Sequence, residues 1–109
     1  MQKTLLTIAA TIAISTTAQA GGYGTTAHNN TVIQKAPTWD KRITDIYVMD
    51  GNTAVIKGNW PASYKTKRWD GVKVANVAAD GWCGEFDKTV QFLYIVDRAN
   101  NKLGGVMCK

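Results

Sequence analysis

Three aromatic and three basic residues alternate within one polar segment, residues 59–71, which has the sequence NWPASYKTKRWDG. Sugars stack on Trp and Tyr rings, and nucleobases stack on them while cations contact the phosphates. Trp, Tyr and Arg also anchor protein–protein interfaces. The alternative is that the indoles of Trp60 and Trp69 fold back over the protein core and the basic residues are only solvated. The candidate partner-binding residues are Trp60, Tyr64, Lys65, Lys67, Arg68 and Trp69.

Residues for catalysis are sparse. The single histidine, His28, lies in a segment with no predicted structure, whereas a nucleophilic site needs an oriented imidazole in a cleft. Glu85 and Asp87 would share one face of a strand, and paired carboxylates hydrolyse glycosides. Two acids beside Lys88 are, however, typical of a solvated turn. We expect no catalytic residues, no cofactor and no metal site, and a small hydrolase using Glu85 or Asp87 stays a third alternative.

The first twenty residues have the pattern of an export signal. Lys3 precedes an apolar run over residues 5–14, and Ala18-Gln19-Ala20 is a small-x-small cleavage site. We therefore expect a mature chain from Gly21 and a periplasmic or secreted location. The apolar run is too short to span a bilayer, so no transmembrane segment is expected in the mature chain.

Export favours a disulfide between the two cysteines, Cys83 and Cys108, because exported thiols meet an oxidising compartment. Closing this loop of about 25 residues stabilises the fold by roughly 3.5 kcal/mol on the chain-entropy model. Cys83-Gly84-Glu85-Phe86 is not a C-x-x-C motif, so redox catalysis is not predicted.

The whole chain of 109 residues has a formal net charge of +5, and removal of Lys3 with the signal lowers it to +4. A positive charge favours anionic neighbours, yet this value is ordinary for the surface of a small soluble domain. We do not expect a nucleic-acid partner.

Short runs rich in Ile, Val and Tyr alternate with turn residues, a pattern that favours strands. Asp50-Gly51 lies between two such runs and predicts a tight hairpin. No stretch of ten residues shows a convincing helical apolar period. The predicted strands are residues 42–49, 53–57, 72–77, 82–86, 89–96 and 103–107.

These elements predict a mainly β or all-β fold, a small antiparallel meander of about five to six strands that forms an open sheet or a small barrel. The expected divisions are a signal peptide at residues 1–20, a flexible amino-terminal arm at 21–37 with a short strand at 31–34, and a β domain at 38–109. Trp39 and Trp82 are expected to cap the core, and the disulfide is expected to join the fourth strand to the last.

The leading functional hypothesis is a small non-enzymatic binding protein with a protein partner. It would be an inhibitor or immunity factor acting on an envelope-directed enzyme or toxin. The hypothesis rests on the small size, the lack of a catalytic set and the aromatic-basic loop. The alternative is a glycan-binding module, such as an oligomeric toxin-type B subunit, with Trp60, Tyr64 and Trp69 as stacking platforms.

Overall fold

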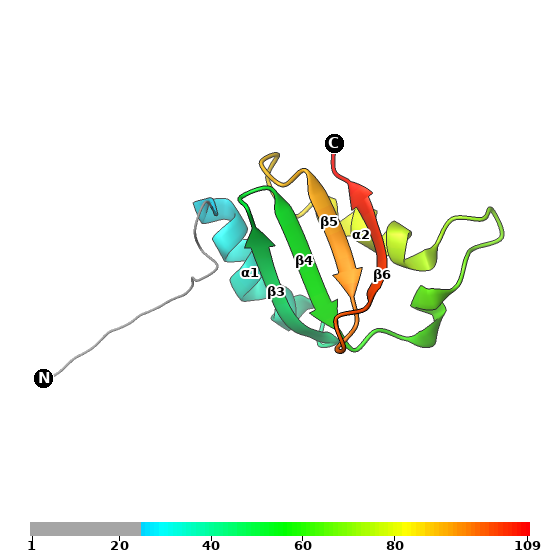
Figure 1. The fold of residues 1–109 in the computed structure, drawn as a ribbon. Helices are drawn as coiled ribbons and strands as arrows, with labels where there is room; N and C mark the ends of the chain where they lie inside the picture. Colours follow the sequence, from blue (N-terminus) through cyan, green and yellow to red (C-terminus); the bar gives the residue numbers. More distant parts are fainter. Residues whose placement is uncertain (1–24) are drawn as a thin grey trace, which may run out of the picture.

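The computed structural model describes residues 25–109, so the expected signal peptide and the first residues of the expected arm lie outside the described part. Within these residues, two α-helices, one short 3-10 helix and four strands follow each other along the chain (Figure 1). Their order is α1 (Ala27–Trp39), β3 (Ile43–Met49), β4 (Thr53–Gly58), η2 (Ala62–Lys65), α2 (Val74–Cys83), β5 (Phe92–Val96) and β6 (Lys102–Met107).

The four strands form one mixed sheet in the order β3-β4-β5-β6. β3 and β4 are an antiparallel hairpin, as are β5 and β6, and the two hairpins meet through parallel pairing of β4 with β5. The predicted Asp50-Gly51 turn is confirmed. Both residues have positive φ, 57° and 73°, which a tight hairpin turn between twisted strands requires.

Both helices cover the same face of the sheet, as Figure 1 shows, and the hydrophobic core lies between these two layers. α1 packs against β3, and α2 packs against β5 and β6. Ile56, Leu93 and Ile95 are fully buried on the two central strands. Within residues 25–109, no helix combines the length and the apolar character that crossing a bilayer needs.

The prediction of an all-β, antiparallel fold of five to six strands is corrected: the sheet is mixed, and the segments predicted as strands at 72–77 and 82–86 contribute to a helix and its following turn. The expected strand at 72–77 ends in the first turn of α2, and the expected strand at 82–86 begins at the end of that helix. Ala75 and Ala79 are spaced four residues apart and are fully buried, so they form the packing face of α2. The sheet is open, and the described residues contribute four strands to it.

The expected arm is also corrected where the structure describes it. Ala27–Trp39 is helix, and it includes the predicted strand at 31–34. The Thr26 side chain caps α1, because its hydroxyl oxygen accepts a hydrogen bond from the backbone N–H of Asn29 at 3.1 Å. Val32 and Ala36 are buried in the core, so α1 is part of the domain.

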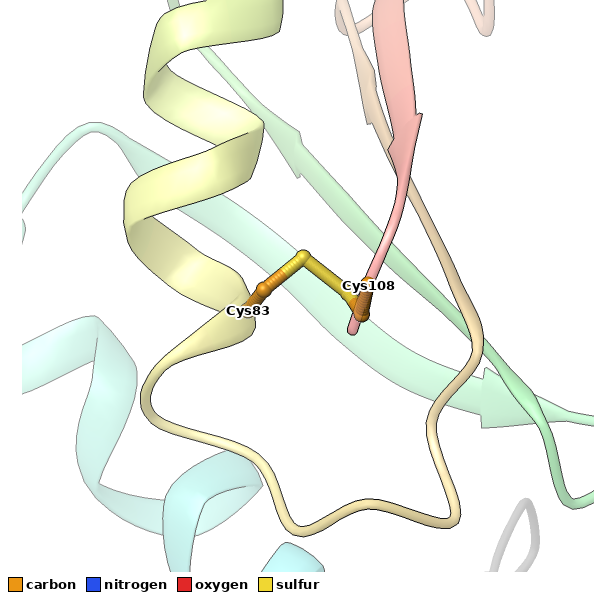
Figure 2. The surroundings of a disulfide bond; sticks show 2 residues. All are labelled: Cys83 and Cys108. Atoms are coloured by element: carbon orange, nitrogen blue, oxygen red, sulfur yellow. A yellow bond between two sulfur atoms is a disulfide. The ribbon is translucent and has the colours of Figure 1, made fainter.

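The predicted disulfide between Cys83 and Cys108 is confirmed, and the two Cα atoms lie 5.5 Å apart. Figure 2 shows that it links the end of α2 to the chain just after β6. It therefore joins a helix to a strand end, where the sequence predicted a link between two strands. A disulfide is consistent with an oxidising compartment outside the cytoplasm.

Candidate functional site

The structure divides the six predicted binding residues into two groups. Trp60 and Tyr64 are half-buried and pack against the core. The other four lie in exposed positions on or beside the segment that leads to α2. These four are Lys65, Lys67, Arg68 and Trp69.

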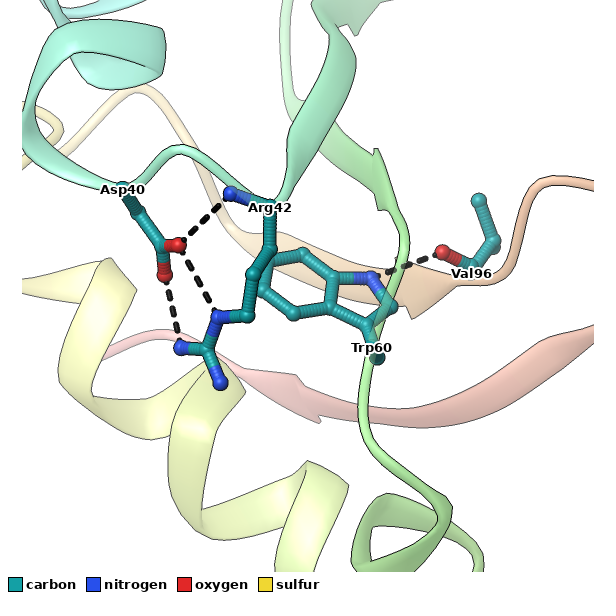
Figure 3. A network of polar contacts seen from close by, with 4 residues as sticks. All are labelled: Asp40, Arg42, Trp60 and Val96. Carbon is teal, nitrogen blue, oxygen red and sulfur yellow. Dashed lines mark hydrogen bonds and ion pairs between the residues drawn. The ribbon is translucent and has the colours of Figure 1, made fainter.

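Trp60 is held in place by a hydrogen bond and by ring stacking. Its indole Nε1 donates to the carbonyl oxygen of Val96 at the end of β5, at 2.9 Å (Figure 3). The Trp60 and Tyr64 rings stack in parallel, with centroids 5.2 Å apart and an interplanar angle of 5°. These contacts tie η2 to the sheet, so Trp60 has a structural role at the base of the loop.

Arg42, which the sequence did not single out, covers this stack. Its guanidinium carbon lies 5.1 Å from the Trp60 ring centroid and 5.6 Å from that of Tyr64. Two of its nitrogens donate to the carboxylate of Asp40, at 2.9 and 2.8 Å (Figure 3). These bonds hold the pKa of Asp40 below its usual range and raise that of Arg42.

Residues 66–73 form a short protruding loop, which we call the finger. Its two sides are paired like a small antiparallel hairpin. Arg68 N donates to Val72 O at 2.7 Å, and Lys67 and Lys73 form an isolated bridge. Figure 1 shows this yellow-green segment reaching away from the sheet beyond β6. The finger is thus a shaped projection with its own backbone hydrogen bonds.

The tip of the finger is compact and exposes an indole. Gly71 adopts a φ of +82°, which allows the tight turn there. Arg68 forms an ion pair of 2.6 Å with Asp70, and this contact lowers the pKa of Asp70. Trp69 is 93% exposed, far more than any other large apolar residue among those described. The tip therefore presents a large apolar ring beside Arg68.

Asp87 and Glu85, the two acidic residues considered for catalysis, differ from each other in their surroundings. The Asp87 carboxylate accepts hydrogen bonds from Thr26, Asn29 and Thr89, and these bonds hold its pKa well below the usual range. Asp87 thus acts as an anchor for α1 and is not poised to exchange a proton. Glu85 is exposed, and its backbone carbonyl accepts a hydrogen bond from His28 Nε2 at 2.8 Å. His28 belongs to α1, whereas the sequence predicted a flexible arm there.

Trp82 is half-buried beside the disulfide and packs on the core, as expected. The expectation that Trp39 caps the core is wrong, because Trp39 is 52% exposed and stacks on Trp82 at the surface. Over residues 25–109, no group of three or more His, Cys, Asp or Glu side chains is arranged to hold a metal ion.

In comparisons with known proteins, no protein-family model, curated protein or solved structure matches the chain. The functional argument therefore rests on the geometry of this molecule.

Proposed function

We propose that this is a small non-enzymatic binding protein that recognises a protein partner through the finger. In this proposal it acts in the periplasm or outside the cell, as an inhibitor or immunity factor against an envelope-directed enzyme or toxin. The observation that carries the proposal is the exposed indole of Trp69 at the tip of a hydrogen-bonded projection.

Exposure of a whole indole to water is unfavourable, and burial of such a ring drives many protein interfaces. A projection that carries Trp and Arg suits a concave surface, such as the cleft of an enzyme. The backbone pairing of the finger limits the ordering cost of binding, because its shape exists before the partner arrives.

The alternative of a glycan-binding module is less well supported by the positions of the rings. Trp60 and Tyr64 stack on each other under Arg42, so part of each ring is already occupied. Trp69 stands apart at the tip of the finger. These three side chains therefore do not form the common stacking platform on which that alternative was based.

The test is affinity capture from cell-envelope extracts and culture supernatant, followed by binding measurements with the captured protein. We expect Trp69→Ala to weaken binding by about 2 kcal/mol or more, the range of interface hot spots, without a change in melting temperature. A Lys65→Gln, Lys67→Gln, Arg68→Gln triple variant should also bind more weakly. Met107→Ala is the matched control, because Met107 is 72% exposed but lies on β6 and outside the finger.

Unchanged affinity in both the Trp69→Ala variant and the basic triple variant would contradict the proposal. Gel filtration separates it from the alternative, because an inhibitor would run as a monomer and a ring-forming toxin-type subunit as an oligomer.

A further inference from the structure

A hollow of about 410 Å³ opens beside the two helices and η2, on residues that the proposed function does not use. Three of its lining residues are aromatic, two are small and one is acidic. We call it the aromatic groove. Its lining residues are Trp39, Tyr64, Ala78, Gly81, Trp82 and Glu85.

The small residues on α2 keep the groove open. Ala78 and Gly81 lie on its wall, and a Cβ added to Gly81 would meet no atom within 4 Å. The indoles of Trp39 and Trp82 stack on each other beside this space, with ring centroids 6.5 Å apart and planes inclined by 23°. Trp39 keeps 52% of its surface exposed although a core lies nearby. The groove thus exposes aromatic surface that the fold itself does not bury.

The charges of the lining indicate the chemistry of a ligand. Glu85 is the charged residue of the lining, and its carboxylate is negative. The faces of Trp and Tyr rings are also negative, because of their π electrons. A sugar would find one carboxylate, one phenol and two indole N–H groups as hydrogen-bonding partners, but it carries no positive charge to complement that of Glu85. Aromatic faces with one carboxylate instead complement a weakly hydrated organic cation.

We propose that the aromatic groove binds a small free solute that carries a trimethylammonium group, such as a compound of the choline type. The methyl groups would lie against the exposed surface of the Trp39–Trp82 stack, and Glu85 would balance the charge. Trp39 is 52% exposed, so it offers the surface of this stack that a cation can reach.

Aromatic rings of this molecule already hold cations in this way, and one of them is Tyr64 of the groove lining. Lys102 Nζ lies 4.5 Å from the centroid of Tyr94, and Arg42 lies over Trp60 and Tyr64. Arg42 already covers part of the Tyr64 ring, but its charge is balanced by the bidentate bond to Asp40. The groove therefore keeps the negative character that a cationic ligand needs.

The test is titration of the purified oxidised protein with choline chloride, followed by tryptophan fluorescence and by calorimetry, with sodium chloride at equal ionic strength as the blank. The uncharged isostere 3,3-dimethylbutan-1-ol shows what shape alone contributes. We expect choline to bind on the order of tenfold more tightly than this alcohol. N-acetylglucosamine and phosphatidylcholine vesicles are titrated in parallel.

Four variants locate the site. Gly81→Leu should abolish choline binding by filling the groove, and it should still fold because its Cβ meets no atom within 4 Å and the side chain extends from an exposed position. Glu85→Gln should weaken binding several-fold, and Trp39→Ala should do so as well. Trp69→Ala is the matched control, because it removes an exposed indole outside the groove and should leave choline affinity unchanged.

Equal affinity for choline and the alcohol would overturn the proposal, as would wild-type affinity in a folded Gly81→Leu variant. Binding of N-acetylglucosamine without choline, or of vesicles without free choline, would also overturn it. None of these results bears on the finger, so the two proposals fail independently.

Discussion

Asn29 and Asp87 exchange two hydrogen bonds across 58 residues of chain. The Asp87 amide donates to Asn29 Oδ1 at 2.9 Å, and Asn29 Nδ2 donates to Asp87 Oδ1 at 3.0 Å. Asn29 is 1% exposed, so these bonds satisfy a buried amide as well as fix the start of α1. The contact explains how a helix with many polar residues is held on the sheet.

The carboxylate of Asp87 should make stability depend on acid. Its pKa is lowered in the folded protein by the hydroxyl of Thr26, the groups of Thr89 and the amide of Asn29, whereas in the unfolded chain it has its ordinary value of about 3.9. The stabilisation is therefore complete above about pH 5 and is lost as the pH falls through 4 and below. We expect urea unfolding to show this loss.

Asp87→Asn isolates this effect. At pH 7 the variant should lose about 2 kcal/mol, the scale of hydrogen bonds to a charged acceptor. The difference from the wild type should shrink between pH 5 and pH 2.5, because the wild type then loses the same contribution. A difference that stays constant over this range would show that ionised Asp87 does not stabilise the fold.

Trp60 and Trp69 should respond in opposite ways to truncation. Trp60→Ala removes a packed ring and its bond to Val96, so we expect a loss of about 3 kcal/mol in the free energy of unfolding. Trp69→Ala should change stability by less than about 0.5 kcal/mol, because the ring is exposed. Trp60→Phe keeps a ring and should cost about 1 kcal/mol for the lost hydrogen bond. Chemical denaturation of the three variants measures all three values, and similar losses for both alanine variants would disprove the division of the loop.

Two glycines should differ in their tolerance of a methyl group. In β6, a Cβ on Gly104 would lie 2.5 Å from Asn76 Oδ1 and 2.8 Å from Ala75 Cβ, so Gly104→Ala should cost about 1–3 kcal/mol. In α2, Gly81→Ala meets nothing and should stabilise the helix by about 0.5–1 kcal/mol. Thermal unfolding of both variants tests the close contact of α2 with β6, and equal melting temperatures would argue against it.

Loss of the disulfide should cost about 2–5 kcal/mol, the range found for small disulfide-bonded domains. Cys83→Ser and the Cys83→Ser, Cys108→Ser double variant should be destabilised alike, because the bond and not a single thiol supplies the stability. Guanidinium unfolding of both variants and of the reduced wild type gives the three values for comparison. A wild-type midpoint in the double variant would refute this role.

The strands were predictable because their signals are local. Asp50-Gly51 marks the first hairpin by turn chemistry alone, and residues 89–96 are apolar enough to indicate a buried strand. The helices were missed for two reasons. α1 is rich in Asn and Thr, which favour helices weakly, and it depends on the distant contact between Asn29 and Asp87. In α2, Asp80-Gly81 resembles a turn, although the spacing of Ala75 and Ala79 was a helical signal.

The candidate site was predictable only as a segment. Composition identified residues 59–71, but it did not show that Trp60 packs inward while Trp69 points to solvent. The inward position of Trp60 depends on Val96 and Arg42, which are distant in sequence and contact Trp60 only in the folded chain. The groove was missed for the same reason, since Trp39 and Trp82 come together only when the two helices lie on one face.

The position of the disulfide decides what a protease would leave behind. The bridge closes a covalent ring over residues 83–108, so a cut in the chain inside this ring leaves the two pieces joined until the bond is reduced. The finger lies outside the ring and presents Lys67 and Arg68 to trypsin-like enzymes. A cut there would separate α1 and the first hairpin from α2 and the second hairpin. The nicked protein would then hold together through the parallel pairing of β4 with β5 and the core packing around it, as a complex of two fragments.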